Sequence, residues 1–252
     1  MRFHPWVFSG AIAQIVGEPA EGDIVGVFSQ GGDFLAYGHY QIGSIAVRVL
    51  SFAGEDVLSP DFWRNMIARA LRVRVAAGLA CPVSPVAGSV SSVAEPLSPA
   101  VPPASSAAEP VEATGLVERP ALTNCYRLIH GEGDGLPGLI IDYYDGVCVM
   151  QAHSVGMFRA KGAICEALKS VYGPFLKAVY DKSSGTAPFK AGLDLVDGYL
   201  YRSESFSDDE QIVLENGHKF FVNWTEGQKT GFFLDQGRTG PLSGNIPKAA
   251  TY

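Results

Sequence analysis

Long apolar runs are absent from this sequence, which contains no stretch of about 18 uncharged apolar residues, so a membrane-spanning helix is not expected. Cysteine is scarce, and no Cys-x-x-Cys spacing occurs among Cys81, Cys125, Cys148 and Cys165. This pattern argues against a zinc site or a disulfide framework and is typical of reduced thiols. The first residues lack the charged-then-apolar layout of a signal peptide, so a cytoplasmic location is predicted.

An excess of positive charge is also lacking. The 252 residues include 19 Lys+Arg against 26 Asp+Glu, a formal net charge of −7, whereas nucleic-acid binding normally needs a basic surface. The acidic excess is uneven, with a net charge of −1 over residues 1–80, −3 over residues 81–120 and −3 over residues 121–252. Because the short middle segment carries much of this excess, the overall charge does not exclude an RNA partner. The 47% hydrophobic content is enough for one large or two small cores.

The middle segment has almost nothing from which to build a core. Residues 81–115 include 7 prolines and no aromatic or basic residue. Prolines remove backbone donors, and small side chains bury too little area to offset the entropy cost of ordering the chain. The composition predicts a Pro/Ala/Ser-rich linker over 81–120. Docking of a proline-recognising partner at Pro99-x-x-Pro102 is the less favoured alternative, because flanking basic residues are missing.

Upstream of the linker, apolar runs of strand length recur about every 10 residues between 11 and 50, which predicts a small β-barrel or sandwich. Ser59-Pro60-Asp61 predicts a helix start, and an apolar stripe continues to about residue 77. Arginines decorate the rest of this helix. The simpler interpretation is that these arginines form a solvent-exposed helix face. The more specific one is that they contact an RNA backbone.

Downstream of the linker, the pattern predicts strands at 122–130, 139–144 and 147–153, a helix at 157–171, and further strands at 175–181, 200–205, 211–214 and 219–224. Asp145-Gly146 is a strong hairpin-turn signal between the second and third strands. The order of these elements predicts an α+β domain in which one sheet is covered by a helix.

Several motifs suggest chemistry but lack the context that the chemistry requires. Gly133-x-Gly135-x-x-Gly138 matches a dinucleotide fingerprint, yet it contains Pro137 and precedes a strand instead of a helix. Gly227-Gln228-Lys229-Thr230 lacks the spacing of a phosphate-binding P-loop, and Lys229-Thr230-Gly231 has no accompanying Ser-x-x-Lys. The five histidines show no metal-ligand spacing. The residues alone therefore predict neither a catalytic constellation nor a metal site.

Four segments in order carry a more specific pattern. They are residues 4–10 (HPWVFSG), 126–142 (YRLIHGEGDGLPGLIID), 179–183 (VYDKS) and 227–236 (GQKTGFFLDQ). In their order and spacing they resemble the bacterial class I SAM-dependent methyltransferases that act on cytosine C5 of large-subunit ribosomal RNA. The resemblance covers residues 1–80 and 121–236.

The resemblance implies an RNA-binding barrel of the PUA type, a central α+β domain, and a Rossmann-like domain that binds SAM and carries a catalytic cysteine. Motifs of the last domain are missing here. We therefore predict an α+β chain with a PUA-like β-barrel and connecting helix at 1–80, a linker at 81–120, the central domain at 121–236, a non-family tail at 237–252, and no Rossmann-like domain. On this view no SAM is bound by this chain alone, and the chain is truncated and inactive by itself.

The expected function is recognition of ribosomal RNA. By charge and stacking capacity, the expected RNA contacts are Arg2, His4, Trp6, Arg64, Arg69 and Arg72. The resemblance places a domain-junction motif at Lys229, Thr230, Gly231, Asp235 and Gln236, next to Phe232 and Phe233, which are expected to be exposed. Two alternatives stay open. The chain could be half of a two-chain methyltransferase, with a SAM-binding partner or as a homodimer, or a scaffold acting through the linker and these phenylalanines.

Overall fold

The computed structural model describes residues 4–52, 57–80, 123–188, 192–204, 206–207, 211–232 and 234. The first 49 of these form the N-terminal unit, a four-stranded antiparallel sheet in the order β1-β4-β3-β2. Its strands are β1 (Trp6–Phe8), β2 (Ile24–Phe28), β3 (Phe34–Tyr40) and β4 (Ile45–Ser51), with a short 3-10 turn η1 (Ser9–Ala11) after β1. Strands β1 and β2 each pair with one neighbour, so the hydrogen bonding within residues 4–52 is that of an open sheet.

Helix α1 (Phe62–Ala76) follows the N-terminal unit. It begins after Asp61, slightly later than the Ser59 start that the sequence suggests, and no side chain caps its first turn. Its buried residues recur at spacings of three and four, as expected for a helix with one apolar stripe. They are Phe62, Trp63, Met66, Ile67, Ala70 and Leu71.

The central unit, residues 123–232, is built on a five-stranded sheet in the order β5-β6-β7-β8-β9. Its strands are β5 (Cys125–His130), β6 (Leu139–Tyr144), β7 (Val147–Ala152), β8 (Ala178–Asp181) and β9 (Gly198–Arg202). The turn between β6 and β7 is confirmed at Asp145-Gly146, where φ is 43° and 96°. Both values are positive, as a two-residue hairpin turn of the primed type requires.

The sheet is mixed, which corrects the predicted fold class. Strands β7 and β8 run parallel, while the other three neighbouring pairs are antiparallel. Between them the chain passes through α2 (Val155–Arg159), α3 (Lys161–Tyr172) and η3 (Gly173–Phe175). A helical crossover returns the chain to the same edge of the sheet, so the next strand must run parallel. This strand–helix–strand unit is the building block of Rossmann-like folds, and the prediction of an α+β fold without a Rossmann-like part is therefore wrong.

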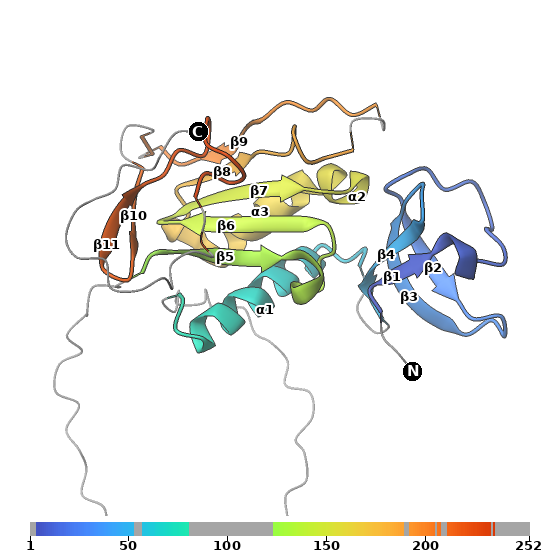
Figure 1. Ribbon diagram of the computed structural model, residues 1–252. Coiled ribbons are helices and arrows are strands. Elements are labelled where there is room, and N and C mark those ends of the chain that lie inside the picture. Colours follow the sequence, from blue (N-terminus) through green and yellow to red (C-terminus); the bar gives the residue numbers. More distant parts are fainter. Residues whose placement is uncertain are drawn as a thin grey trace, which may run out of the picture.

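The two faces of this sheet are covered differently (Figure 1). Helices α1 and α3 pack on one face, where Leu128, Ile141 and Met150 are completely buried. On the opposite, open face, the hairpin of β10 (Ile212–Glu215) and β11 (His218–Phe221) and the segment after it cover only part of the sheet. There Trp224 stacks on Tyr144, with ring centroids 6.3 Å apart.

The N-terminal unit lies beyond the end of the sheet toward which β5 and β7 point (Figure 1). The two units are closely packed, since a Cβ atom added to Gly156 would lie 2.2 Å from the imidazole of His39. Arg159 also donates to the Asp23 carboxylate across the same contact, at 3.2 Å. Helix α2 is thereby held against the N-terminal unit.

Candidate functional site

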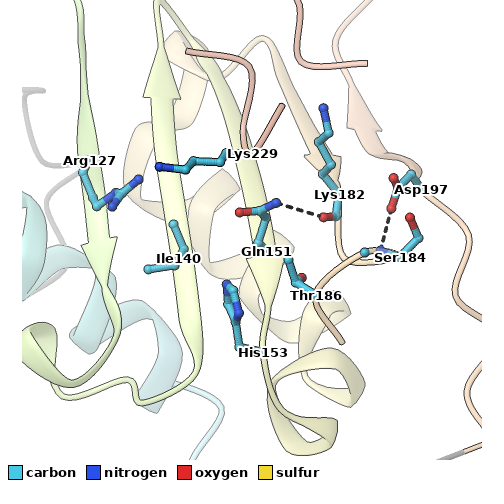
Figure 2. A pocket seen from close by; sticks show the side chains of 10 residues that line it. Arg127, Ile140, Gln151, His153, Lys182, Ser184, Thr186, Asp197 and Lys229 are labelled. Carbon is cyan, nitrogen blue, oxygen red and sulfur yellow. Dashed lines mark hydrogen bonds between the residues drawn. The ribbon is translucent and has the colours of Figure 1, made fainter. Parts of the chain in front are cut away.

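A pocket of about 550 Å³, lined by polar and charged residues together with Ile140, lies on the open face of the central sheet. Side chains alternate between the two faces of a strand, so the neighbours of the buried Leu128, Ile141 and Met150 point to this side. These neighbours are Arg127, Ile140 and Gln151, and all three line the pocket (Figure 2). Strand alternation therefore builds the floor of the site from three strands that are separate in the sequence.

The rest of the pocket lies at the carboxyl ends of the parallel strands β7 and β8. A Ser/Gly-rich turn, residues 182–186, follows β8 and is fixed to β7, because Ser183 Oγ accepts from the backbone N–H of Ala152 at 2.9 Å. Thr186 Oγ1 donates to the carbonyl of Ala152 at 2.8 Å. The carboxyl ends of parallel strands are where open α/β sheets bind their ligands.

Asp197 borders the pocket on the far side from Arg127 (Figure 2). Its Oδ1 atom accepts from the backbone N–H of Ser184 at 2.8 Å, which places the carboxylate beside the turn. Gly185 adds open space there, since nothing lies within 4 Å of where its Cβ would be. A ligand can therefore approach the backbone of this turn closely.

On the side of the pocket opposite Asp197, a buried carboxylate holds the surrounding polar side chains in place. Asp142 is fully buried, and its two oxygens accept from Arg127 Nε at 2.8 Å and from a terminal nitrogen of Arg127 at 3.0 Å. The Thr230 hydroxyl also donates to Asp142, at 2.6 Å, and lies 3.0 Å from the Tyr144 hydroxyl. Burial of a charge is costly unless it is paired and hydrogen-bonded, and this network meets that requirement while fixing the guanidinium at the pocket wall.

Lys182 holds the segment that overhangs the pocket. Its ammonium donates to the carbonyl of Trp224 at 2.5 Å and to that of Gly227. Desolvation lowers the pKa of Lys182, and the Asp197 carboxylate opposes that shift. Lys182 therefore fixes the 223–231 segment in place and adds positive charge to the site.

His153 lies at the rim between the pocket and the N-terminal unit. Partial burial lowers the pKa of His153, and the guanidinium groups of Arg48 and Arg127 lower it further, against the opposing effect of Glu132. Because the shift is downward from a value of 6.5, the imidazole is neutral at pH 7 and can both donate and accept a hydrogen bond.

The joint between the two units is the 3-10 turn η2 (Gly131–Asp134). Glu132 accepts from the indole N–H of Trp6 at 2.8 Å and from Arg48 at 3.1 Å, and the Arg48 guanidinium lies 5.7 Å from the centre of the Trp6 ring. On its other side the turn presents Asp134, which forms a two-pronged ion pair with Arg74. One short turn thus ties both β1 and α1 to the sheet.

The structure brings some of the expected RNA contacts together. Trp6 reaches η2 through Glu132, and Arg69 reaches the same turn by donating to the Asp134 carbonyl at 3.3 Å. His4 stays next to Trp6, with ring centroids 5.4 Å apart. Arg64 and Arg72 are exposed on α1, Arg64 pairs with Asp61, and Arg2 lies outside the described residues.

The expected domain-junction motif has a clear position for three of its five residues. Thr230 is buried on Asp142, while Lys229 and Gly231 flank it with φ values of 51° and 117°. Asp235 and Gln236 lie outside the described residues, as does Phe233. The expectation that Phe232 is exposed is wrong, because it packs against the cluster on the open face, 5.1 Å from the Phe220 ring.

Three cysteines are described, and all are buried free thiols. Burial raises the pKa of Cys125 to about 12 and that of Cys165 to about 11, and it also raises the pKa of Cys148. Thiols in this state stay protonated and are poor nucleophiles. Within the part of the chain that the structure describes, no set of His, Cys, Asp and Glu side chains could hold a metal ion, and no helix is long and apolar enough to cross a membrane.

Of the ten residues that line the pocket, sequence reasoning named only Lys229 as a site residue; the polar and charged residues that it missed include Arg127, Gln151, His153, Lys182 and Asp197. One signal was available: polar residues interrupt otherwise apolar strands at alternate positions, as Gln151 and His153 do at the end of β7. Alternation marks a shared face, but only the strand pairing shows that these faces converge.

Residues 1–52 match the family model of a PUA-like domain. Over 236 residues the chain is 32% identical to the ribosomal RNA large subunit methyltransferase I of Pseudoalteromonas translucida, covering 93% of this chain and 48% of that protein. The protein of the same name from Aeromonas hydrophila is 31% identical over 239 residues, covering 94% of this chain and 49% of its own. The chain therefore spans about half the length of the curated relatives it matches.

Solved structures show the same fold. A candidate SAM-dependent methyltransferase from Streptococcus mutans aligns with 92% of this chain and 47% of its own, with a TM-score of 0.60 and 18% identity. A candidate methyltransferase complexed with SAH also aligns with 92% of this chain and 47% of its own, with a TM-score of 0.61 and 18% identity. These matches show that the chain shares its fold with these two structures over 92% of its length. They also contradict the expectation that this chain has no cofactor of its own, because a protein of the same fold is complexed with SAH.

Proposed function

We propose that this chain takes part in SAM-dependent methylation of large-subunit ribosomal RNA. The observation that carries the proposal is the similarity over 93% of the chain to proteins named ribosomal RNA large subunit methyltransferase I. The described structure supplies matching parts, a PUA-like unit packed against a sheet with a pocket at the carboxyl ends of its parallel strands. Cytosine C5 as the methylated position rests on the four resembling segments.

RNA would contact the side of the molecule where the two units meet. The described groups proposed for this role are His4, Trp6, Arg64, Arg69 and Arg72, to which the structure adds Arg48 beside Trp6. Arg2 is proposed as an RNA contact too, and it lies outside the described residues. Guanidinium groups bind phosphate, and aromatic rings stack on unpaired bases. Arg69 and Arg48 already make intramolecular contacts, so part of their role is to fix the joint at η2.

SAM is the cofactor proposed for this activity, and its electrophilic methyl group is what it would supply when bound. The pocket fits it in size, since ligand pockets commonly measure about 300–1,000 Å³. The polar groups also fit: Asp197 could accept from ribose hydroxyls, and the cations Lys229 and Arg127 could hold a carboxylate. The Ser/Gly-rich turn after β8 provides the close backbone approach that nucleoside sites use.

RNA binding is tested by measuring the affinity of the chain for a large-subunit ribosomal RNA fragment across a salt series. We expect the logarithm of the association constant to fall linearly with the logarithm of salt concentration, by about 0.7 per phosphate contact on single-stranded RNA. Arg64→Ala with Arg72→Ala should reduce this slope. Absence of binding, or an affinity that salt does not change, would overturn the RNA part of the proposal.

Cofactor binding is tested separately by calorimetric titration of SAM and SAH into the same chain. A saturable heat change with either compound supports the proposal. If neither binds, SAM is not held by this chain, whatever the outcome with RNA. The scaffold alternative rests on the 81–115 segment and Phe233, which lie outside the described residues, and on Phe232, which packs against the open face. The described residues offer no support for a two-chain enzyme either.

A further inference from the structure

Lys229 stands in an unusual position above the pocket. We propose that Lys229 binds the anionic group of a nucleoside-type ligand in this pocket, and that residues 223–231, named here the anchored loop, are built to present it. This inference rests on the proposed function and deepens it, because SAM and an RNA nucleotide each contain a nucleoside and an anionic group, a carboxylate in SAM and a phosphate in RNA. It assigns one residue, one loop and one class of ligand to the pocket.

The anchored loop is compact and internally hydrogen-bonded. The side-chain oxygen of Asn223 accepts from the backbone N–H groups of Thr225 at 3.1 Å and Glu226 at 2.9 Å. Gly227 then donates to the Asn223 carbonyl at 3.0 Å, and a Cβ atom at Gly227 would lie 2.2 Å from that oxygen. Only glycine fits this approach, so the loop has one defined conformation.

Both ends of the anchored loop are fastened to the sheet beneath it. Lys182 donates to the carbonyls of Trp224 and Gly227 at the first end. Thr230 donates to the buried Asp142 at the second end. Lys182 directly follows β8 and Asp142 lies in β6, so the loop cannot shift without breaking contacts inside the pocket wall. Thr230 and Lys182 are therefore positioning residues.

Lys229 itself adopts φ = 51°, which is uncommon for a residue with a side chain and costs free energy. The surrounding contacts hold it there, since Gly231 donates to the Gln228 carbonyl at 2.9 Å and Thr230 is fixed next to it. The result is visible in Figure 2, where the lysine side chain reaches across the pocket toward Arg127. Such strain, held by surrounding contacts, is typical of functional sites.

The carboxylate of Asp197 lies away from the Lys229 and Arg127 cations, an arrangement that suits a nucleoside with an anionic group. Lys229 and Arg127 lie on one side and Asp197 lies on the other, beside Lys182, with Gln151 between the two sides (Figure 2). An anionic group would meet the cations, ribose hydroxyls would meet the carboxylate, and an amide can pair with the edge of a base. A volume of about 550 Å³ admits one such ligand.

The test uses two probes on the full chain, SAH by calorimetry and a fluorescently labelled cytidine-containing RNA hexamer by anisotropy. Lys229→Gly removes the ammonium while tolerating the positive φ, and Lys229→Arg keeps the charge. Lys219→Ala is the matched control, because Lys219 is an exposed lysine of β11 outside the pocket. Loss of a charged hydrogen bond should weaken the bound probe about tenfold or more in Lys229→Gly.

Lys219→Ala should change that affinity less than twofold, and Lys229→Arg should restore most of it. Binding of SAH identifies the cofactor as the ligand, and binding of the hexamer alone identifies an RNA nucleotide. Thr230→Val should weaken the same probe without removing any charge.

The inference is overturned if neither probe binds, or if Lys229→Gly binds as well as Lys219→Ala. If the inference fails but the chain still binds the ribosomal RNA fragment in a salt-dependent way, the proposed function stands. If the chain binds neither the probes nor the RNA fragment, the inference and the proposed function are both rejected.

Discussion

Thr230 donates its hydroxyl hydrogen to the fully buried carboxylate of Asp142 across 2.6 Å, although 88 residues separate them in the sequence. This bond joins the anchored loop to β6 and completes the set of donors around a charge that also pairs with Arg127. The segment that carries Lys229 therefore depends on a carboxylate at the floor of the sheet.

Replacing Thr230 by Val should destabilise the fold, because the buried Asp142 carboxylate then loses one donor. We expect a loss of about 1–3 kcal/mol in the free energy of unfolding, measured by urea denaturation. Thr230→Ser keeps the hydroxyl and should lose less than half as much. Equal stability of the Val and Ser variants would show that the hydroxyl contributes nothing.

Removing Arg74 should be far more damaging than removing Arg72, although both arginines lie on α1. The side chain of Arg74 is only 12% exposed and that of its partner Asp134 only 9%, so Arg74→Met leaves a buried carboxylate without its ion pair. We expect a cost of about 3–5 kcal/mol in unfolding free energy. The exposed Arg72→Met should stay within about 0.5 kcal/mol of the wild type. Thermal and urea denaturation of the two variants provide the comparison.

Alanine at Gly156 should disturb the contact between the two units, whereas alanine at Gly162 should not. A Cβ at Gly156 would lie 2.2 Å from the His39 ring, while at Gly162 nothing lies within 4 Å. Gly162→Ala, within α3, should raise stability by about 0.5–1 kcal/mol through helix propensity. Gly156→Ala should lower it and increase protease cleavage between the units. Indistinguishable stability and proteolysis of the two variants would contradict this packing.

Acid should weaken the same contact through His39, which is 3% exposed and whose Nδ1 atom has no hydrogen-bond partner among the described residues. Burial lowers the pKa of His39 from 6.5 to about 4. The unfolded chain therefore takes up this proton first as the pH falls, and stability drops between pH 6.5 and pH 4, by about 3 kcal/mol in total.

The difference between wild type and His39→Gln across this pH range isolates the imidazole from carboxylates that also titrate. The stability of the wild type should fall more steeply than that of the variant below pH 6.5. Parallel pH profiles for the two proteins would show that His39 does not set the acid sensitivity.

Local patterns predicted most of the strands and helices and the hairpin turn at Asp145-Gly146, because side-chain alternation and turn chemistry act over a few residues. They failed where distant segments decide the outcome. The parallel pairing of β7 with β8 depends on how the α2–α3 crossover packs on the sheet, and that pairing changed the fold class. Phe232 was predicted to be exposed, but it is half-buried against Phe220 of the β10–β11 hairpin.

The sequence by itself determined the segments that resemble ribosomal RNA methyltransferases, the linker composition and the apolar stripes, because each is a property of neighbouring residues. Only the tertiary structure decided that Arg127, Lys182 and Lys229 share one pocket. The physical reason is that the pocket is formed jointly by paired strands, by the turn after the α2–α3 crossover and β8, and by the anchored loop, which are distant from one another in the sequence. The contacts that hold these segments together, such as that of Thr230 with Asp142, join residues far apart in the sequence. Nothing in the sequence around either residue indicates that they are close in space.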